Sequence, residues 1–254
     1  MARKIVITSG KGGVGKTTMT VQLGLCLAKK GERVALLDAD LGLNNLDICA
    51  GVEQDVVYGL SDVAEGKCRV KQALVRHGTF SNLYVLSGGN ANATIDVENF
   101  RAAVAELEKE FDYILIDSPA GVDGGFVLAC SVAKEAVVVV TPHLSSVRDA
   151  DKAVQRLKGA GIAAISLLVN LSRGDLVVSG EEFSPAEIVK LLKLPVLGIV
   201  PYQYLLPCEE NPTPHVAVRY AADILRGGRR RVFDPTKRYS GLVGSIRRNL
   251  KRKL

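Results

Sequence analysis

The stretch that most constrains the fold of this chain is G-K-G-G-V-G-K-T, from Gly10 to Thr17. It stands between an apolar, β-branched run that ends at Thr8 and a helical pattern that starts near Lys16. Glycines let a backbone wrap around a phosphate with its N–H groups pointing inward, and the start of the following helix adds partial positive charge. In this spacing Lys16 reaches the β- and γ-phosphates and the Thr17 hydroxyl ligates Mg²⁺. The residues predicted to hold the phosphates are Gly10, Lys11, Gly12, Gly13, Val14, Gly15, Lys16, Thr17 and Thr18.

The rest of the chain alternates strand patterns with helical ones. The stretches "EAVVVVT" and "ISLLVN" are continuously apolar, as strands buried on both faces require. This alternation predicts an α/β fold, with a doubly wound, mostly parallel sheet flanked by helices, and 254 residues suit one such domain. The expected strands are Lys4–Thr8, Arg33–Asp38, Leu83–Leu86, Tyr113–Asp117, Ala136–Thr141, Ile165–Asn170 and Val196–Val200. The expected helices are Lys16–Lys30, Asp96–Glu110, Ser146–Lys158, Pro185–Leu192 and one from Pro214 toward Leu225.

Acidic residues end two of the expected strands. "VALLDADLGLNNLD" carries Asp38 and Asp40, and "FDYILIDSPAG" carries Asp117 before a Pro-Ala-Gly turn. A single acidic residue at a strand end is often a helix cap or a turn residue. Three carboxylates at the carboxyl edge of a sheet, where ligands bind in such folds, indicate a site beside the phosphate loop.

The extra lysine after the first glycine makes the pattern more specific. "GKGGVGKTT" resembles the deviant Walker A motif of the SIMIBI-class ATPases of the ParA/MinD family. The resemblance implies a homodimer that sandwiches two ATP molecules, with Lys11 reaching the nucleotide of the partner and Lys16 its own. It also implies that Asp40 orients the attacking water and that Thr17, Asp38 and Asp117 surround Mg²⁺. Without the resemblance, Lys11 could equally be an exposed loop lysine.

Two branches of this family fit the sequence poorly. Iron–sulfur members need paired cysteines, whereas the five cysteines of this chain are scattered and contain no C-x-x-C. GTPases carry an N/T-K-x-D motif, which is absent. Asn170 in "LLVNLSR" and the backbone near Pro201 stand where the family contacts adenine.

Three further stretches resemble the MinD branch, which places the division septum. These are "DADLGLNNLD", "DSPAGV" and "LSSVRDADK". The resemblance implies that MinC binds the helix that bears Arg148, Asp149 and Asp151, and it leaves MinE binding open. The same residues could form a solvated helix face. His143 and "CEENPTPH" depart from the branch pattern, and a flagellar-placement ATPase remains an alternative.

The positive charge of the chain is concentrated at its end. From Arg226 onward there are 11 Lys and Arg against one acidic residue, so the remainder holds 22 basic and 26 acidic residues. On a helical wheel of residues 239–254, one 120° arc is apolar except for Lys253, and four basic residues lie on the rest of the circle. This is typical of an interfacial membrane helix. A ParA-like arm that binds nucleic acid would need the charges but not the apolar arc, and a core helix would need the reverse. The residues assigned to the membrane are Tyr239, Leu242, Val243, Ile246, Arg247, Arg248, Leu250, Lys251, Arg252 and Leu254.

The expected organisation is an ATPase domain over residues 1–226, a basic linker over 227–238 and the amphipathic helix over 239–254. No run reaches 18 apolar residues, and "MARKIVITSG" is not a signal peptide pattern. We therefore expect a cytoplasmic protein that binds an anionic inner-membrane surface reversibly. One short helix should bind weakly, and two in an ATP dimer should gain roughly 10²–10⁴ in avidity.

Overall fold

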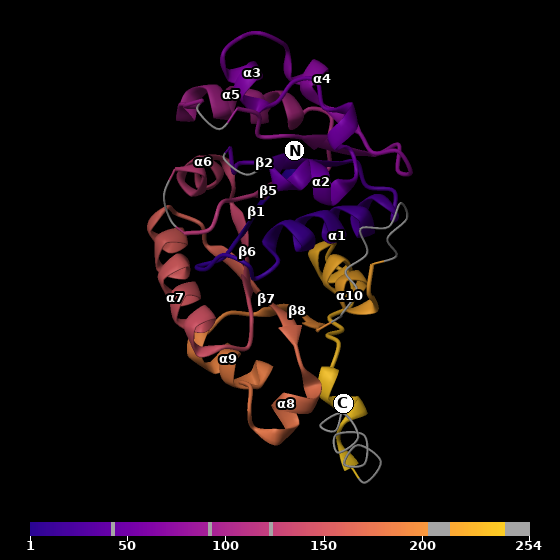
Figure 1. The fold of residues 1–254 in the computed structure, drawn as a ribbon, viewed down its shortest axis with the longest axis vertical. Helices are drawn as coiled ribbons and strands as arrows, with labels where there is room; N and C mark the ends of the chain where they lie inside the picture. The colour runs from indigo at the N-terminus through magenta and orange to yellow at the C-terminus, as the bar shows by residue number, and fades with distance from the viewer. Residues whose placement is uncertain (42–43, 91–92, 122–123, 203–213, 242–254) are drawn as a thin grey trace.

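The computed structural model describes residues 1–41, 44–90, 93–121, 124–202 and 214–241. Its centre is an eight-stranded sheet with the order β3-β4-β2-β5-β1-β6-β7-β8, in which β3 alone runs antiparallel to its neighbour (Figure 1). This confirms the expected mostly parallel, doubly wound sheet. The strands are β1 Arg3–Thr8, β2 Val34–Asp38, β3 Val75–Arg76, β4 Leu83–Leu86, β5 Tyr113–Asp117, β6 Glu135–Val140, β7 Ala164–Ser172 and β8 Val196–Pro201.

Helices cover both faces of the sheet. One face packs against α1, α2 and α10 through a core that includes Ile5 and Ile7, and the other packs against α3–α7 and α9 through a core that includes Val6. Because neither face meets water, the strands need apolar residues at consecutive positions. The helices are α1 Lys16–Ala28, α2 Asn45–Ala50, α3 Leu60–Ala64, α4 Val70–Ala73, α5 Val97–Leu107, α6 Gly125–Val132, α7 Leu144–Gly159, α8 Gly174–Ser179, α9 Pro185–Leu192 and α10 Val216–Leu225, with short 3₁₀ turns η1 Glu53–Asp55 and η2 Pro235–Arg238.

The helix α9 shows how local sequence fixes an element. Ser184 caps it by accepting from the Glu187 backbone at 3.2 Å, while the Glu187 carboxylate accepts from the Ser184 backbone at 2.8 Å. This reciprocal capping box and Pro185 at the first turn confirm the predicted start. The short α2, α3, α4, α6 and α8 were not expected, and no helix in the described ranges is long and apolar enough to cross a membrane.

The segment that follows α10 lies against the domain. Its contacts run from Arg226, which pairs with Glu32 at 2.6 Å, to Pro235, which is buried. η2 packs on α8 and β8, and the yellow ribbon that follows α10 lies beside α8 (Figure 1). A Gly- and Arg-rich sequence predicts a free linker, whereas these contacts hold it in place.

Most of the predicted membrane helix lies outside the described residues. Tyr239 is described: it ends η2, is half-buried, and its ring lies close to Gly174 of α8. The proposed boundaries at 226 and 238 therefore remain predictions. The residues outside the described ranges are Leu242, Val243, Ile246, Arg247, Arg248, Leu250, Lys251, Arg252 and Leu254.

Gly174→Ala should release this segment. A Cβ at Gly174 would overlap the carbonyl of Pro235, so η2 must move away from α8. We expect trypsin to cleave the variant faster within Arg229–Arg231, with little change in the thermal unfolding of the domain. Gly159→Ala is the matched control because nothing lies within 4 Å of its added Cβ. Equal cleavage rates in both variants would show that this contact does not hold the segment.

Candidate nucleotide-binding site

The loop between β1 and α1 is shaped by glycines at close approaches. Gly13 and Gly15 have φ values of 74° and 88°, in the left-handed region that other residues avoid. A Cβ on Gly15 would overlap the Asn170 amide, and one on Gly10 would overlap the Asp149 carbonyl in α7. The loop therefore lies directly against β7 on one side and α7 on the other.

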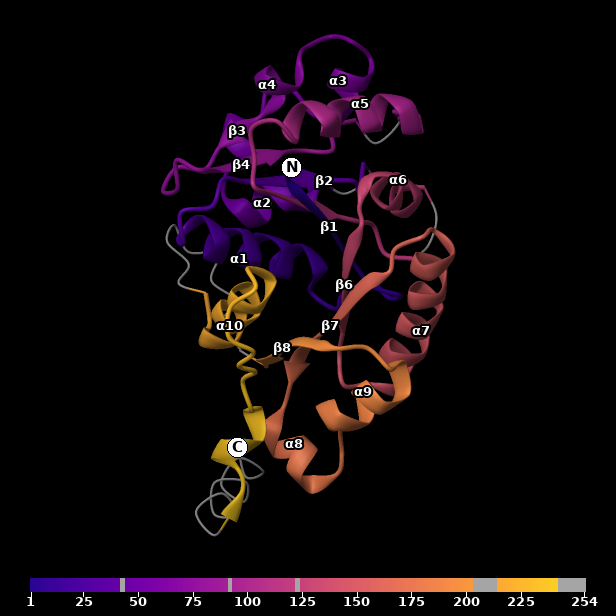
Figure 2. The same ribbon diagram turned by 180° about the vertical axis from the view of Figure 1, so that it is seen from behind.

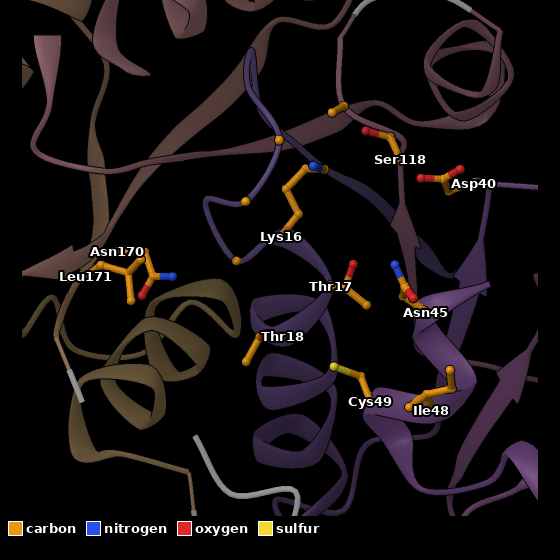
Figure 3. A pocket seen from close by; sticks show the side chains of 14 residues that line it. Lys16, Thr17, Thr18, Asp40, Asn45, Ile48, Cys49, Ser118, Asn170 and Leu171 are labelled. Carbon is orange, nitrogen blue, oxygen red and sulfur yellow. The ribbon is translucent and has the colours of Figure 1, made fainter. Parts of the chain in front are cut away.

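A cleft of about 480 Å³ opens beside this loop. In Figure 3, Asp40 and Ser118 lie on one side of Lys16, and Asn170 and Leu171 lie on the other. Its size falls within the usual range for small-ligand pockets. The residues that line it are Gly12, Gly13, Gly15, Lys16, Thr17, Thr18, Asp40, Asn45, Ile48, Cys49, Ser118, Ala120, Asn170 and Leu171.

Two buried carboxylates stand behind the cleft. Asp38 and Asp117 are register partners at the ends of the adjacent strands β2 and β5, and they are only 1% and 3% exposed. The Asp117 carboxylate accepts from the Thr17 hydroxyl at 2.6 Å and from the Thr20 hydroxyl at 3.1 Å. The Asp38 carboxylate accepts from the backbone N–H of Asp40 in the following turn at 2.8 Å and from that of Leu46 in α2 at 3.3 Å.

Burial raises the pKa of Asp38 to about 7 and that of Asp117 to about 6, and in Asp38 the charge of Asp117 adds to this effect. Lys16 is 9% exposed, and burial lowers its pKa, while Asp117 and Asp40 oppose this shift. Paired carboxylates and a threonine hydroxyl offer the oxygen ligands that Mg²⁺ prefers. The residues present therefore fit a hydrated divalent cation, which would relieve the repulsion between two buried charges.

The two lysines of the loop occupy different positions. Lys16 lines the cleft, whereas Lys11 is exposed, and its ammonium donates to the Ser145 hydroxyl at 3.3 Å at the start of α7. Lys11 therefore does not line the cleft of its own chain. That position leaves its side chain available to a second molecule.

The adenine side of the site is described only in part. Asn170 lines the cleft, and its amide donates to the Val14 carbonyl at 2.9 Å. Leu171 beside it has a φ of 57°, which is unusual for a residue other than glycine. Pro201 ends β8 and does not line the cleft, and residues 203–213 lie outside the described ranges.

The α7 residues predicted to bind a partner lie near the loop but point outward. Arg148 and Asp151 are exposed and Asp149 is partly so. The carboxylate of Asp149 pairs with Lys152 at 3.2 Å, and that of Asp151 accepts from Gln155 at 2.9 Å. The backbone of α7 touches the phosphate loop at Gly10, so these residues stand on a helix that adjoins the loop.

Six cleft residues were not predicted. Ser118 and Ala120 stand in the "DSPAG" turn, whose glycine and proline could have indicated a ligand-facing loop. Leu171 adjoins the predicted Asn170. The remaining three, Asn45, Ile48 and Cys49, belong to the unpredicted helix α2. Nothing in the pattern of six helical residues indicated which side would face the cleft.

Comparison with known proteins gives consistent results. The family model that matches residues 1–211 is that of the ParA family, described as NUBPL iron-transfer P-loop NTPase. The septum site-determining protein MinD of Synechocystis is 39% identical over 263 residues, covering 98% of this chain and 99% of its own. That of Thermotoga maritima is 42% identical over 205 residues, covering 79% of this chain and 76% of its own.

The chain belongs to the ParA family of P-loop NTPases, in its MinD group.

Solved structures agree with this assignment. A chain of the MinC:MinD cell division protein complex of Aquifex aeolicus matches with a TM-score of 0.83 and 38% identity, over 90% of this chain and 97% of its own. MinD of Pyrococcus horikoshii, complexed with Mg-ADP, matches with a TM-score of 0.75 and 29% identity, over 89% and 96%. Family membership confirms the expected P-loop ATPase class, and its relatives act in septum-site determination.

Asp117→Asn should stabilise the metal-free protein above pH 6. The asparagine can still bond both threonines. Its Oδ1 can accept from the Thr17 hydroxyl, and its amide can donate to the Thr20 oxygen, whose own proton is then donated to the Lys16 carbonyl. In the folded protein the pKa of Asp117 is raised from 3.8 to about 6. Ionisation of this carboxyl therefore lowers the free energy of unfolding as the pH rises from 3.8 through about 6. We expect a gain of about 1–3 kcal/mol at pH 8 that disappears near pH 4, measured by urea unfolding with chelator present. A loss of stability at pH 8 would contradict this electrostatic account.

Proposed function

We propose that this protein is an ATP- and Mg²⁺-dependent switch that dimerises on ATP, binds the cytoplasmic face of the inner membrane and recruits division regulators. The observation that carries the proposal is the position of the two loop lysines. Lys16 lines the cleft, while Lys11 stands exposed on its rim beside α7. In the ParA/MinD family this arrangement serves two nucleotides sandwiched between two chains.

Within one chain, the loop backbone would surround the β-phosphate and Lys16 would neutralise the β- and γ-phosphates. Thr17 would ligate Mg²⁺ directly, with Asp38 and Asp117 behind it holding its water shell. The metal, when bound, would offset the charge of the transferring phosphoryl group. Asp40 lines the cleft beside Lys16 and would orient the attacking water. Asn170 would contact adenine from the β7 side, with backbone near Pro201.

Lys11→Ala should leave a folded monomer that binds ATP and does not dimerise. The lysine lies outside its own cleft, so its loss removes a charge from the partner's phosphates only. We expect size exclusion with a non-hydrolysable ATP analogue to give a dimer for the native protein and a monomer for the variant. ATP hydrolysis should fall at least about 10²-fold, because the second lysine supplies transition-state charge.

Lys152→Ala is the matched control. It removes the same charge from an exposed site on α7 and should keep both dimerisation and hydrolysis. A stable ATP dimer of Lys11→Ala would refute the trans role of Lys11.

The membrane part of the proposal rests on the amphipathic pattern of residues 239–254. Each basic residue near an anionic leaflet contributes about 1 kcal/mol, but ordering a short segment costs about 1–2 kcal/mol per residue. A single tail should thus bind weakly and release easily. In a dimer the second insertion becomes intramolecular, so ATP would switch attachment on and hydrolysis would switch it off.

Ile246→Glu should abolish binding to anionic vesicles while ATP-dependent dimerisation persists. On the helical wheel this residue lies inside the apolar arc, where a carboxylate would enter the acyl region. Ser245→Glu carries the same change of charge on the polar side and should retain most binding. Vesicle co-sedimentation with ATP and with ADP measures both variants. If Ile246→Glu still binds, charge alone attaches the tail.

The proposed partners are MinC and, as an open case, MinE. The support is that the Aquifex aeolicus neighbour is a MinC:MinD complex and that α7 of this chain exposes Arg148 and Asp151 beside the phosphate loop. A ParA-like role on DNA is the competing outcome. Binding to duplex DNA without binding to anionic vesicles would replace the membrane role.

A further inference from the structure

The segment from α10 to η2 is strongly basic and largely unneutralised. Positions 219–238 contain seven Lys and Arg against two acidic residues. All seven are exposed. Arg226 pairs with Glu32 and Arg231 stacks over Tyr220, whereas the other five form no ion pair with any residue in the described ranges. We call these five the basic face: Arg219, Arg229, Arg230, Lys237 and Arg238.

The described carboxylates around the basic face are engaged elsewhere. Asp234 caps η2 by accepting from the backbone and hydroxyl of Thr236 at 2.9 and 2.6 Å. Asp223 pairs with Lys30, and Glu32 pairs with Arg226. Since no acidic group in the described part of the chain pairs with them, the charges of the five cations can act on an external anion.

Packing holds these residues on one side of the domain. Arg231 stacks over the Tyr220 ring at 4.5 Å, and Phe233 meets the His215 ring edge-on at 5.0 Å. His215 lies near both ends of the segment. Burial is the main cause that lowers its pKa, and the charges of Arg219 and Arg238 lower the pKa further. The basic residues of α10 and η2 are therefore close in space and not spread along a free tether.

We propose that the basic face binds the headgroups of anionic phospholipids and so fixes the orientation of the ATPase domain on the bilayer. The proposal rests on the membrane attachment proposed above. Arg238 precedes the predicted membrane residue Leu242 by four positions, a span of at most about 14 Å of chain. That is under two Debye lengths at physiological salt, so a tail in the interface brings the basic face into the field of the leaflet. Guanidinium groups bind phosphate in a bidentate manner, which suits headgroups.

This orientation has a consequence for α7. In both views α10 and α7 lie on opposite sides of β6 and β7 (Figures 1 and 2), and they pack on opposite faces of the sheet. A domain that turns its α10 side to the bilayer therefore turns Arg148 and Asp151 away from it. Partners could reach α7 from the cytoplasm while the protein stays on the membrane.

The test uses the full chain with Arg229 and Arg230 both changed to glutamine. The probe is vesicles of phosphatidylglycerol and phosphatidylcholine, with ATP and Mg²⁺ present. We expect binding at least about tenfold weaker than that of the native protein and less dependent on salt, since each charge lost should cost roughly fivefold. ATP-dependent dimerisation, followed by size exclusion, should not change. Arg156→Gln with Lys158→Gln removes the same charge from exposed positions on α7 and should bind vesicles like the native protein.

Each other outcome has a separate meaning. If the native protein fails to bind vesicles, the proposed membrane function fails. The basic face has no specific role if the native protein binds vesicles and the Arg229/Arg230 variant binds them equally well. The same conclusion holds if the Arg229/Arg230 and Arg156/Lys158 variants lose the same amount of vesicle binding. If the Arg229/Arg230 variant keeps vesicle binding and loses binding to duplex DNA, the face serves nucleic acid and the lipid proposal is overturned.

Discussion

The site depends on two negative charges that are held where water cannot reach them. Asp38 and Asp117 end adjacent strands in the same register, and burial is the main cause that raises the pKa of both. Hydrogen bonds that both carboxylates accept offset part of the cost of this burial. The hydrogen bonds come from the first turn of α1 and from the turn after β2, so the phosphate loop and the Asp40 turn are both anchored to the same carboxylates. Any cation that enters will therefore act on both segments together.

At the basic end of the chain, one set of residues packs against the domain and another set carries the exposed charge. Arg231, Phe233 and Pro235 use their side chains to attach the segment to the domain. The arginines and lysines that flank this stretch at 229, 230, 237 and 238 face solvent. Apolar and aromatic contacts hold the segment against the domain, so the flanking cations do not have to form ion pairs with it. Composition alone shows only the charge.

Sequence reasoning succeeded where a pattern is long or chemically specific. The central strands and α9 were predicted within two residues, because continuous apolar runs and a capping box are strong local signals. The loop and the three aspartates were placed because strand ends in a parallel sheet converge. Helix α2 was not predicted because six residues are too few to show a helical period. Its Ile48 and Cys49 reach the cleft through tertiary packing. The packing of η2 on α8 was also not predicted, because Gly174 and Pro235 are distant in sequence and come into contact only in the folded chain.

The contact between the phosphate loop and α7 limits which positions of the helix can change in sequence. The phosphate loop meets α7 through the main chain at Gly10 and the Asp149 carbonyl, and also through the hydrogen bond from Lys11 to the Ser145 hydroxyl. Neither contact involves the exposed side chains of Arg148 and Asp151. Those outer positions of α7 can therefore change without altering the contacts between the helix and the loop. Gly10 is the constrained position, because any side chain there would overlap the helix backbone.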